Sequence, residues 1–258
     1  MTSHWTKYIK TEKEIAIMRE NGAILAKILA DLKGMVKPEL NTMDLEKEFI
    51  RLCKKHSVRP ACKGFDPYGM DPYPTGLCLS INSDSVHCYP KKTKTIHEGD
   101  IVTIDTVIEK DDMYVDAAVS LTVGKSSDKR KKMVQIAEAS VMEAIKKVKD
   151  GVHIGDISNA MHTVVKNAGF EVLRDYAGHG IGSEMHEYPE IPCYGREGTG
   201  DTLYAGMTIC IESLVCEGNP AITYKNEWET SMRDGKDWVQ FEHTVLVTKD
   251  GYEIITTR

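Results

Sequence analysis

Residues 99–105 read Gly-Asp-Ile-Val-Thr-Ile-Asp, and a segment of the same design, Gly-Met-Thr-Ile-Cys-Ile-Glu, occupies residues 206–212. In each segment a carboxylate ends a run rich in β-branched residues, a pattern that predicts a strand. Asp116 and Glu242 each open a further β-like run, and a pair of expected helices accompanies each half. The repetition predicts two similar halves that each bring two carboxylates to a shared site. Chance resemblance is the alternative, since a glycine before a strand is common.

Capping signals and hydrophobic periodicity predict the elements around these segments. Thr11 and Glu14 form a capping-box pattern before a helix that ends at Gly34, and a second helix begins at Thr42. Further helices are expected at about 128–149 and 156–167, and β-like runs at 77–81, 101–107, 114–123, 170–173, 207–212, 239–247 and 252–255. Residues 65–76, rich in Pro, Gly, Asp and Tyr, are expected to form a surface loop. We expect an N-terminal tail at 1–10 and one α+β catalytic domain at 11–258.

The composition is that of an ordinary globular protein. Its 258 residues are 41% hydrophobic and 28% charged, which excludes fibrous and disordered classes. The net charge of −6 argues against a nucleic-acid scaffold and against adsorption to an anionic membrane. Seven cysteines without a C-x-x-C pair make a disulfide framework or zinc ribbon unfavourable. With no apolar leader and no long apolar run, we expect a cytoplasmic protein.

Four carboxylates in β-like runs are candidate metal-binding groups: Asp105, Asp116, Glu212 and Glu242. A single acidic residue in a strand is equally compatible with an edge strand that faces solvent. Four converging carboxylates would repel one another, and two divalent cations would neutralise them. His179 lies between small residues in Gly-His-Gly, which leaves its ring open to a ligand, although a lone histidine is more often structural. Oxygen donors with one imidazole suit Co, Mn, Fe or Zn.

The carboxylates and the histidine belong to specific motifs, which extend over nearly the whole chain. They are Ser-Ile-Asn-Ser-Asp-Ser-Val-His at 80–87, Val-Thr-Ile-Asp at 102–105, Tyr-Ala-Gly-His-Gly-Ile-Gly at 176–182, His-Glu-Tyr-Pro at 186–189, Ile-Glu at 211–212 and Gln-Phe-Glu-His-Thr at 240–244. In these motifs the chain resembles the type I methionine aminopeptidases of the pita-bread metallopeptidase family. The resemblance implies a pseudo-twofold antiparallel sheet covered by two helix pairs, with a metal site in the central cleft.

The resemblance also implies the role of each residue. The ligands of two divalent ions would be Asp105, Asp116, His179, Glu212 and Glu242. A water between the ions would attack the scissile carbonyl, and Glu212 would pass its proton towards the leaving amine. His87 would hydrogen-bond the scissile amide nitrogen, and His186 would stabilise the oxyanion. The implied activity is removal of the initiator methionine from nascent proteins whose second residue is small.

A pocket for the methionine side chain is expected to be apolar and lined by polarizable groups, because a thioether packs well against aromatic rings and sulfur. By resemblance, its residues besides His87 and His186 are Cys62, Phe65, Tyr73, Cys78, Trp228 and Gln240, with Met185 just before His186. For Phe65 and Met185 an ordinary core position is an equally good interpretation. The stretch Asp-Pro-Tyr-Gly-Met-Asp-Pro at 66–72 lengthens the loop near this pocket relative to the short bacterial form of the family.

Three alternatives remain at this point. X-Pro aminopeptidases and prolidases share the fold but normally carry an additional N-terminal domain. Type II methionine aminopeptidases carry a helical insertion between the second histidine and the first glutamate, and only 25 residues separate His186 from Glu212 here. A non-catalytic pita-bread binding protein would lose metal ligands, and this chain keeps them. Nascent polypeptide N-termini are the expected partners, the ribosome is a candidate partner, no nucleic-acid binding is expected, and the family leads us to expect a monomer.

Overall fold

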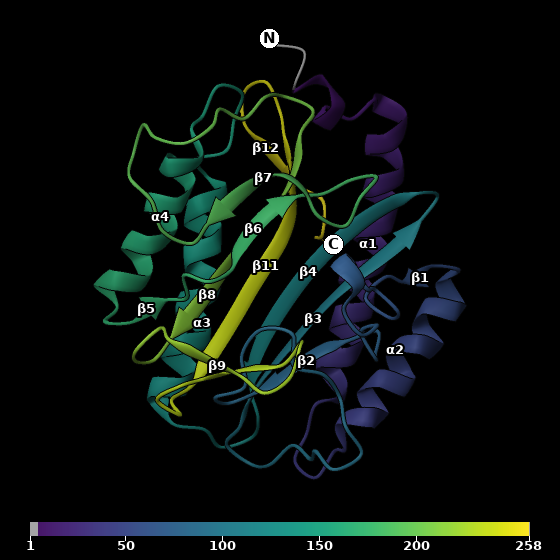
Figure 1. Ribbon diagram of the computed structural model, residues 1–258, viewed down its shortest axis with the longest axis vertical. Helices are drawn as coiled ribbons and strands as arrows, with labels where there is room; N and C mark the ends of the chain where they lie inside the picture. The colour runs from purple at the N-terminus through teal and green to yellow at the C-terminus, as the bar shows by residue number, and fades with distance from the viewer. Residues whose placement is uncertain (1–4, 258) are drawn as a thin grey trace.

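A ten-stranded antiparallel sheet forms the framework of the molecule (Figure 1). The structure is a computed structural model that describes residues 5–257, apart from the side chain of Tyr68. The main path of the sheet runs β1-β3-β4-β11-β8-β6-β7, while β2, β5 and β12 pair with β3, β8 and β11. These strands are β1 (Arg59–Pro60), β2 (Cys78–Ile81), β3 (Ile101–Lys110), β4 (Met113–Thr122), β5 (Glu171–Val172), β6 (Ala177–Gly180), β7 (Glu187–Pro192), β8 (Thr208–Cys216), β11 (Trp238–Val247) and β12 (Tyr252–Ile254). A separate hairpin joins β9 (Ile222–Tyr224) to β10 (Thr230–Met232).

Two helix pairs cover one face of this sheet, as Figure 1 shows. The helices are α1 (Glu12–Met35), α2 (Thr42–His56), α3 (Asp128–Ile145) and α4 (Ile154–Asn167), with short 3-10 helices η1 (Thr6–Tyr8) and η2 (Pro67–Gly69). Helix α1 packs on β3 and β4, whereas α3 packs on β8 and β11. Each pair lies over its own hydrophobic cluster. Because β4 and β11 meet at the centre of the sheet, the two halves predicted from the repeated segments lie side by side, which confirms the predicted pseudo-twofold α+β fold.

Helix α1 shows how local sequence signals and tertiary packing combine. The hydroxyl of Thr11 accepts a hydrogen bond from the amide of Glu14, and the Glu14 carboxylate accepts one from the amide of Thr11 at 2.7 Å. The predicted capping box therefore forms and starts the helix. At Gly22 a Cβ atom would lie only 2.2 Å from the carbonyl oxygen of Ile255. The C-terminal end of the chain can therefore pack directly on the helix backbone only because residue 22 is glycine.

Strands β6 and β7 were not predicted, and their composition explains why. Strand β6 carries two glycines, and β7 carries two prolines, residue types that disfavour strands. A Cβ atom at Gly178 would lie 2.3 Å from the carbonyl oxygen of Cys210 on β8, and one at Gly180 would lie 2.3 Å from that of Tyr188 on β7. Glycine is required here because three backbones approach closely, and a propensity argument does not detect such contacts.

Residues 5–10 belong to the segment that is expected as an N-terminal tail. Residue Ile9 forms a β-bridge with Met207, and the ammonium of Lys10 forms a buried ion pair with the carboxylate of Glu187. These two residues therefore contact the rest of the chain. Within residues 5–257 no helix is both long and apolar enough to cross a membrane.

Candidate metal centre

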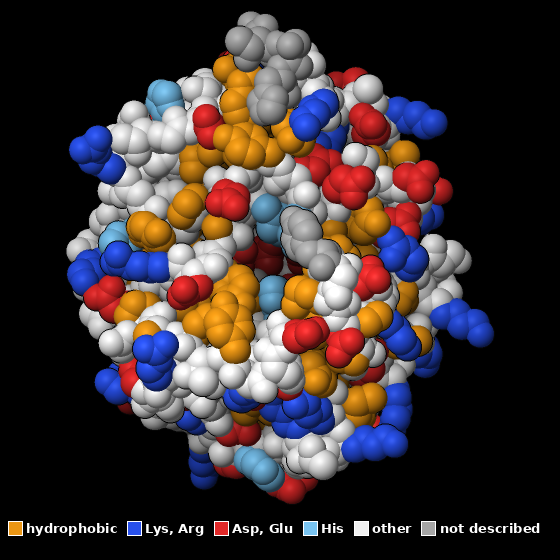
Figure 2. All heavy atoms as spheres, in the orientation of Figure 1, with side chains coloured by type: hydrophobic (Ala, Val, Ile, Leu, Met, Phe, Trp, Pro, Cys, Tyr) orange, Lys and Arg blue, Asp and Glu red, His pale blue; other side chains and the backbone are white. Residues whose placement is uncertain are grey.

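The register of the central strands aligns three of the four predicted carboxylates in one row across the sheet. Asp105 on β3 is paired with Ala118 on β4, Ala118 with Glu242 on β11, and Glu242 with Glu212 on β8. Since alternate residues of a strand share a face, Asp116 lies on the same face as Ala118. The side chains line a cavity of about 720 Å³, and Figure 2 shows acidic and histidine side chains in a central hollow of the surface. The sheet thus gathers carboxylates that are distant in sequence.

These buried carboxyl groups have too few hydrogen-bond donors around them to stabilise their ionised forms. Burial raises the pKa of Asp105 to about 7 and that of Glu212 to about 8. Burial and the neighbouring carboxylates raise the pKa values of Asp116 and Glu242 well above the ordinary range. Atoms Oδ1 of Asp116 and Oε1 of Glu242 are buried with no hydrogen-bond partner among the described residues. Unpartnered oxygens in an acidic cavity are the arrangement that divalent cations would complete, so the residues fit the expected ions.

His179 on β6 presents a free ring nitrogen to the same cavity. Its Nδ1–H donates to the carbonyl oxygen of Gly180 at 2.8 Å, which leaves the lone pair on Nε2. Nε2 lies 3.8 Å from Oδ2 of Asp116. Burial is the largest cause that lowers the pKa of His179 to about 3, so the ring is neutral at physiological pH. A neutral imidazole held by a backbone carbonyl is the form that binds a metal.

Two groups that the sequence reasoning did not assign to the metal site also face these donors. The sulfur of Cys210 lies with the donor atoms of Asp116, His179 and Glu242 in a cluster whose members are all within 4.8 Å of one another. Cys210 stands two residues before Glu212 on β8, and this spacing was the available signal for a shared face. The carboxamide of Gln240 donates at 3.1 Å to both Glu212 and Glu242.

The two predicted non-ligand histidines also line the cavity. His87 is held at φ 60°, a left-handed backbone conformation that is rare outside glycine. Burial is the main reason why its pKa falls to about 4, so His87 is a neutral hydrogen-bonding group. His186 is exposed at the rim of the cavity, and its ring centroid lies 4.5 Å from that of His179. Both rings can therefore contact a molecule bound over the carboxylates.

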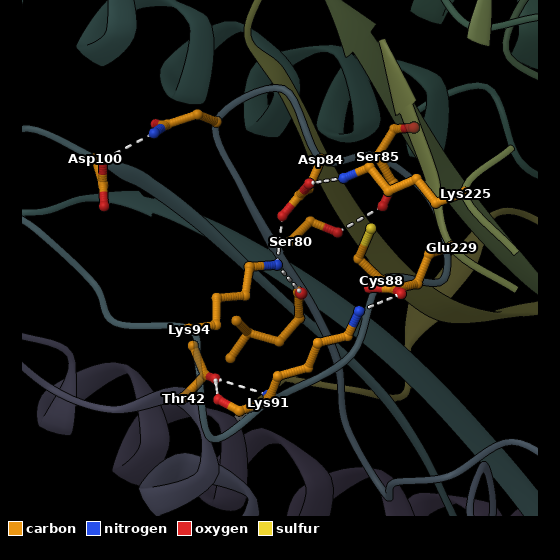
Figure 3. Close-up of polar contacts among 12 residues, drawn as sticks. Thr42, Ser80, Asp84, Ser85, Cys88, Lys91, Lys94, Asp100, Lys225 and Glu229 are labelled. Carbon is orange, nitrogen blue, oxygen red and sulfur yellow. Dashed lines mark hydrogen bonds and ion pairs between the residues drawn. The ribbon is translucent and has the colours of Figure 1, made fainter. Parts of the chain in front are cut away.

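An ionic network holds the segment that carries His87 against the segment that carries Trp228 (Figure 3). Asp84 forms ion pairs with both Lys94 and Lys225. Lys91 pairs with Glu229, and Figure 3 shows these side chains pointing towards one another between the two segments. The network fixes two walls of the site relative to each other.

A second cavity of about 550 Å³ adjoins the first, and His87 and His186 line both. Its inner wall carries most of the residues expected to bind methionine, namely Cys62, Phe65, Tyr73, Cys78 and Trp228, together with Met185. The rings of Tyr73 and Trp228 meet edge to face at 5.1 Å. Gln240 lines the adjoining metal cavity, because it lies on β11 two residues before Glu242; its contact with a bound substrate stays a prediction.

The loop at 66–72 closes the outer side of this second cavity. The indole Nε1–H of Trp228 donates to the carbonyl oxygen of Asp71 at 2.7 Å, and the amide of Asp71 donates to the carboxylate of Glu227 at 2.9 Å. These two bonds tie the loop to the Trp228 segment. Met70 of the loop then lines the cavity. The added residues thus contribute a wall of the pocket.

Comparison with known proteins agrees with this geometry. Residues 16–249 match the model of metallopeptidase family M24. The chain is 35% identical to methionine aminopeptidase 1 of Bacillus subtilis over 96% of this chain and 98% of that protein, and 37% identical to a methionine aminopeptidase of Clostridium perfringens, with the same coverages. The crystal structure of a methionine aminopeptidase from Thermotoga maritima has a TM-score of 0.93 and 39% identity, with coverages of 97% of this chain and 99% of that one.

More distant structures share only the fold. A prolidase from Pyrococcus furiosus has a TM-score of 0.77 at 22% identity, and the match covers 97% of this chain but 66% of the prolidase. The matches to methionine aminopeptidases, in contrast, cover nearly the full length of both partners. The chain therefore belongs to metallopeptidase family M24 and, within it, to the methionine aminopeptidases.

Proposed function

We propose that this protein is a metal-dependent aminopeptidase that removes the N-terminal methionine from polypeptides, with nascent proteins as the substrate class. The observation that carries the proposal is the junction of two cavities. One is lined by carboxylates and His179, the other by aromatic rings and sulfur, and His87 and His186 line both. A methionine side chain in the second cavity would place its carbonyl carbon over the carboxylates of the first.

The proposed ligands are Asp105, Asp116, His179, Glu212 and Glu242, with Asp116 and Glu242 shared between two ions. Two bound divalent cations, of Co, Mn, Fe or Zn, would polarise the scissile carbonyl and lower the pKa of water. Orphaned oxygens on Asp116 and Glu242 support this assignment, because each of these carboxylates has an atom that no described residue satisfies.

Glu212 is the proposed proton carrier. Its carboxylate takes the proton of the attacking water and delivers it to the leaving amine. The side chain is buried, and Gln240 donates to its Oε2 at 3.1 Å, which holds the carboxylate in a fixed orientation. A buried carboxylate with one oxygen held in place is well positioned for repeated proton transfer.

His87 and His186 are the proposed hydrogen-bond partners of the substrate. His87 would hydrogen-bond the scissile amide nitrogen, and His186 would donate to the oxyanion that forms on the carbonyl oxygen. Their places on the walls of both cavities support these roles. The proposal includes a cytoplasmic, monomeric enzyme that acts on polypeptide N-termini, with a preference for small second residues.

The test is cleavage of defined peptides by chelator-treated protein, with and without added cation. We expect release of methionine from Met-Ala-Ser only when Co²⁺ or Mn²⁺ is present, and slower release when the second residue is leucine. Glu212→Ala should abolish turnover while its circular dichroism spectrum stays unchanged. Equal turnover of Glu212→Ala and wild type, or full activity in excess chelator, would contradict the proposal. Preferential cleavage of an X-Pro peptide over Met-Ala-Ser would favour the prolidase-type alternative.

A further inference from the structure

The thiol of Cys210 lies inside the proposed metal centre, although Cys210 is not one of the five proposed ligands. Its sulfur and one donor atom from each of Asp116, His179 and Glu242 all lie within 4.8 Å of one another. The side chain is fully buried on β8. It is the only cysteine that joins such a cluster among the residues that the structure describes.

The sulfur of Cys210 has two polar neighbours, the carboxylate of Glu242, which is itself a member of the cluster, and the hydroxyl of Thr244. The hydroxyl of Thr244 lies 3.7 Å away. That hydroxyl already donates to the carbonyl oxygen of Asp116 at 2.8 Å and accepts from its amide at 3.0 Å. Because a hydroxyl has one proton, Thr244 has none left for the sulfur, and in these contacts the thiol is the donor. The sulfur lone pairs therefore accept no hydrogen bond from Thr244 and can bind a cation.

Two other members of the cluster each carry an oxygen without a hydrogen-bond partner, and the third carries a free lone pair. Oδ1 of Asp116 and Oε1 of Glu242 are buried without a hydrogen-bond partner among the described residues. Nε2 of His179 carries a lone pair because its Nδ1–H is bound to Gly180. Two oxygens, one nitrogen and one sulfur that converge in this way form a four-donor set of the kind that binds zinc or iron.

We propose that Cys210 is a sulfur ligand of the ion held by Asp116, His179 and Glu242, which gives this site a preference for thiophilic metals. The inference rests on the proposed metal centre and extends it. On ligation the S–H bond is replaced by a sulfur–metal bond, and the proton passes to solvent. Thiolate ligands favour Zn²⁺ and Fe²⁺, whereas all-oxygen sites suit Mn²⁺ and Mg²⁺. The cysteine therefore makes the centre more selective against Mn²⁺ than a site of carboxylates and one imidazole.

The test is a Co²⁺ titration of the full-length protein followed by absorption spectroscopy, with bound cobalt measured by elemental analysis. A cobalt–thiolate bond produces an intense charge-transfer band in the near ultraviolet, and oxygen and nitrogen ligands do not. All seven cysteines are buried, so surface thiols do not contribute such a band. Cys216, also buried on β8 but outside the cluster, provides the matched control. We expect the band in wild type and in Cys216→Ser, and its loss in Cys210→Ser.

The outcomes separate this inference from the proposed function. Bound Co²⁺ in wild type without the band overturns sulfur ligation and leaves the peptidase assignment intact. A band that persists in Cys210→Ser also overturns it. Failure of wild type to bind Co²⁺ contradicts both the inference and the metal centre. Competition of Zn²⁺ against Mn²⁺ gives a second readout: Cys210→Ser should lose part of the preference for Zn²⁺, and an unchanged preference would count against ligation.

Discussion

At the scale of single residues, the candidate site separates the proposed metal ligands from the residues that we expect to contact substrate. His186 is exposed at the rim, with its ring 4.5 Å from that of the proposed ligand His179. It can approach a substrate carbonyl oxygen without contacting the carboxylate row. Its proposed role is therefore stabilisation of charge that develops during the reaction, not binding of the ground state.

This separation predicts the kinetics of His186→Ala. Loss of one donor to an oxyanion lowers kcat by roughly 10²- to 10³-fold, and we expect a loss of that size with little change in Co²⁺ affinity. Steady-state kinetics on Met-Ala-Ser and a cobalt titration provide the measurements. His97→Ala is the control, because His97 is exposed and contacts Glu39 far from the cavity. An unchanged kcat in His186→Ala would contradict the role.

The residues of the site were predictable to different degrees. The carboxylates were predictable because acidic residues in otherwise apolar runs need an explanation, and their motifs resemble a known family. The contacts of Gln240 and Cys210 with the acidic residues were not predicted, because these contacts depend on the register between β8 and β11. Register is a property of paired strands and cannot be read from either strand alone.

At the scale of elements, strand β6 can hold His179 in the cavity only because its glycines allow the backbones of β7 and β8 to approach closely. Helices α1–α4 and strands β3, β4, β8 and β11 follow from periodicity, caps and apolar runs, so the sequence was sufficient to predict them within a few residues. Strands β6 and β7 are stabilised by neighbours that are distant in sequence, and their local composition opposes strand formation.

The close approach predicts the effect of Gly178→Ala. The added Cβ would lie 2.3 Å from the carbonyl oxygen of Cys210 and would push β6 away from β8. We expect a loss of roughly 1–3 kcal/mol in the free energy of unfolding, together with weaker Co²⁺ binding, because His179 moves with β6. Gly34→Ala is the control, since nothing lies within 4 Å of its added Cβ, and its stability should be unchanged or slightly higher. Urea denaturation of both variants measures the difference, and equal stabilities would contradict the packing argument.

The loop at 66–72 predicts a specificity effect. Met70 lines the proposed methionine pocket, so Met70→Ala would remove apolar contact area from a bound methionine side chain. We expect KM for Met-Ala-Ser to rise while kcat stays near the wild-type value. Lys63→Ala, at an exposed position before the loop, is the matched control. A fall in kcat without a change in KM would show that the loop acts on the chemistry and not on binding.

At the scale of the whole molecule, the proposed metal ligands come from both halves of the fold. Asp105 and Asp116 come from the first half, and His179, Glu212 and Glu242 come from the second. Cations bound between them would hold β4 and β11 together at the centre of the sheet, where the two halves meet. Binding to the folded state alone would stabilise the entire domain.

This arrangement predicts how stability depends on pH. In the metal-free protein burial raises the pKa of Glu212 to about 8 and that of Asp105 to about 7, whereas in the unfolded chain carboxyl groups titrate at about 4. Between pH 6.5 and 8 the folded state therefore binds more protons, and stability falls as pH rises. His87 and His179, with pKa values lowered to about 4 and 3, oppose this trend mainly below pH 6.5.

Cations reverse the effect because they replace those protons. We expect the rise in Tm on addition of Mn²⁺ to be larger at pH 8 than at pH 6.5, as measured by calorimetry with and without chelator. A rise in Tm that is equal or smaller at pH 8 would contradict the buried, cation-requiring carboxylates.

The most direct measurement is an anomalous-scattering map from crystals of the protein loaded with Mn²⁺. The account predicts two peaks in the central cavity, both within bonding distance of Asp116 and Glu242, one also contacting His179 and the other Asp105. No peak in that cavity, or ions bound only elsewhere on the protein, would contradict the claim that these five side chains hold a pair of divalent cations.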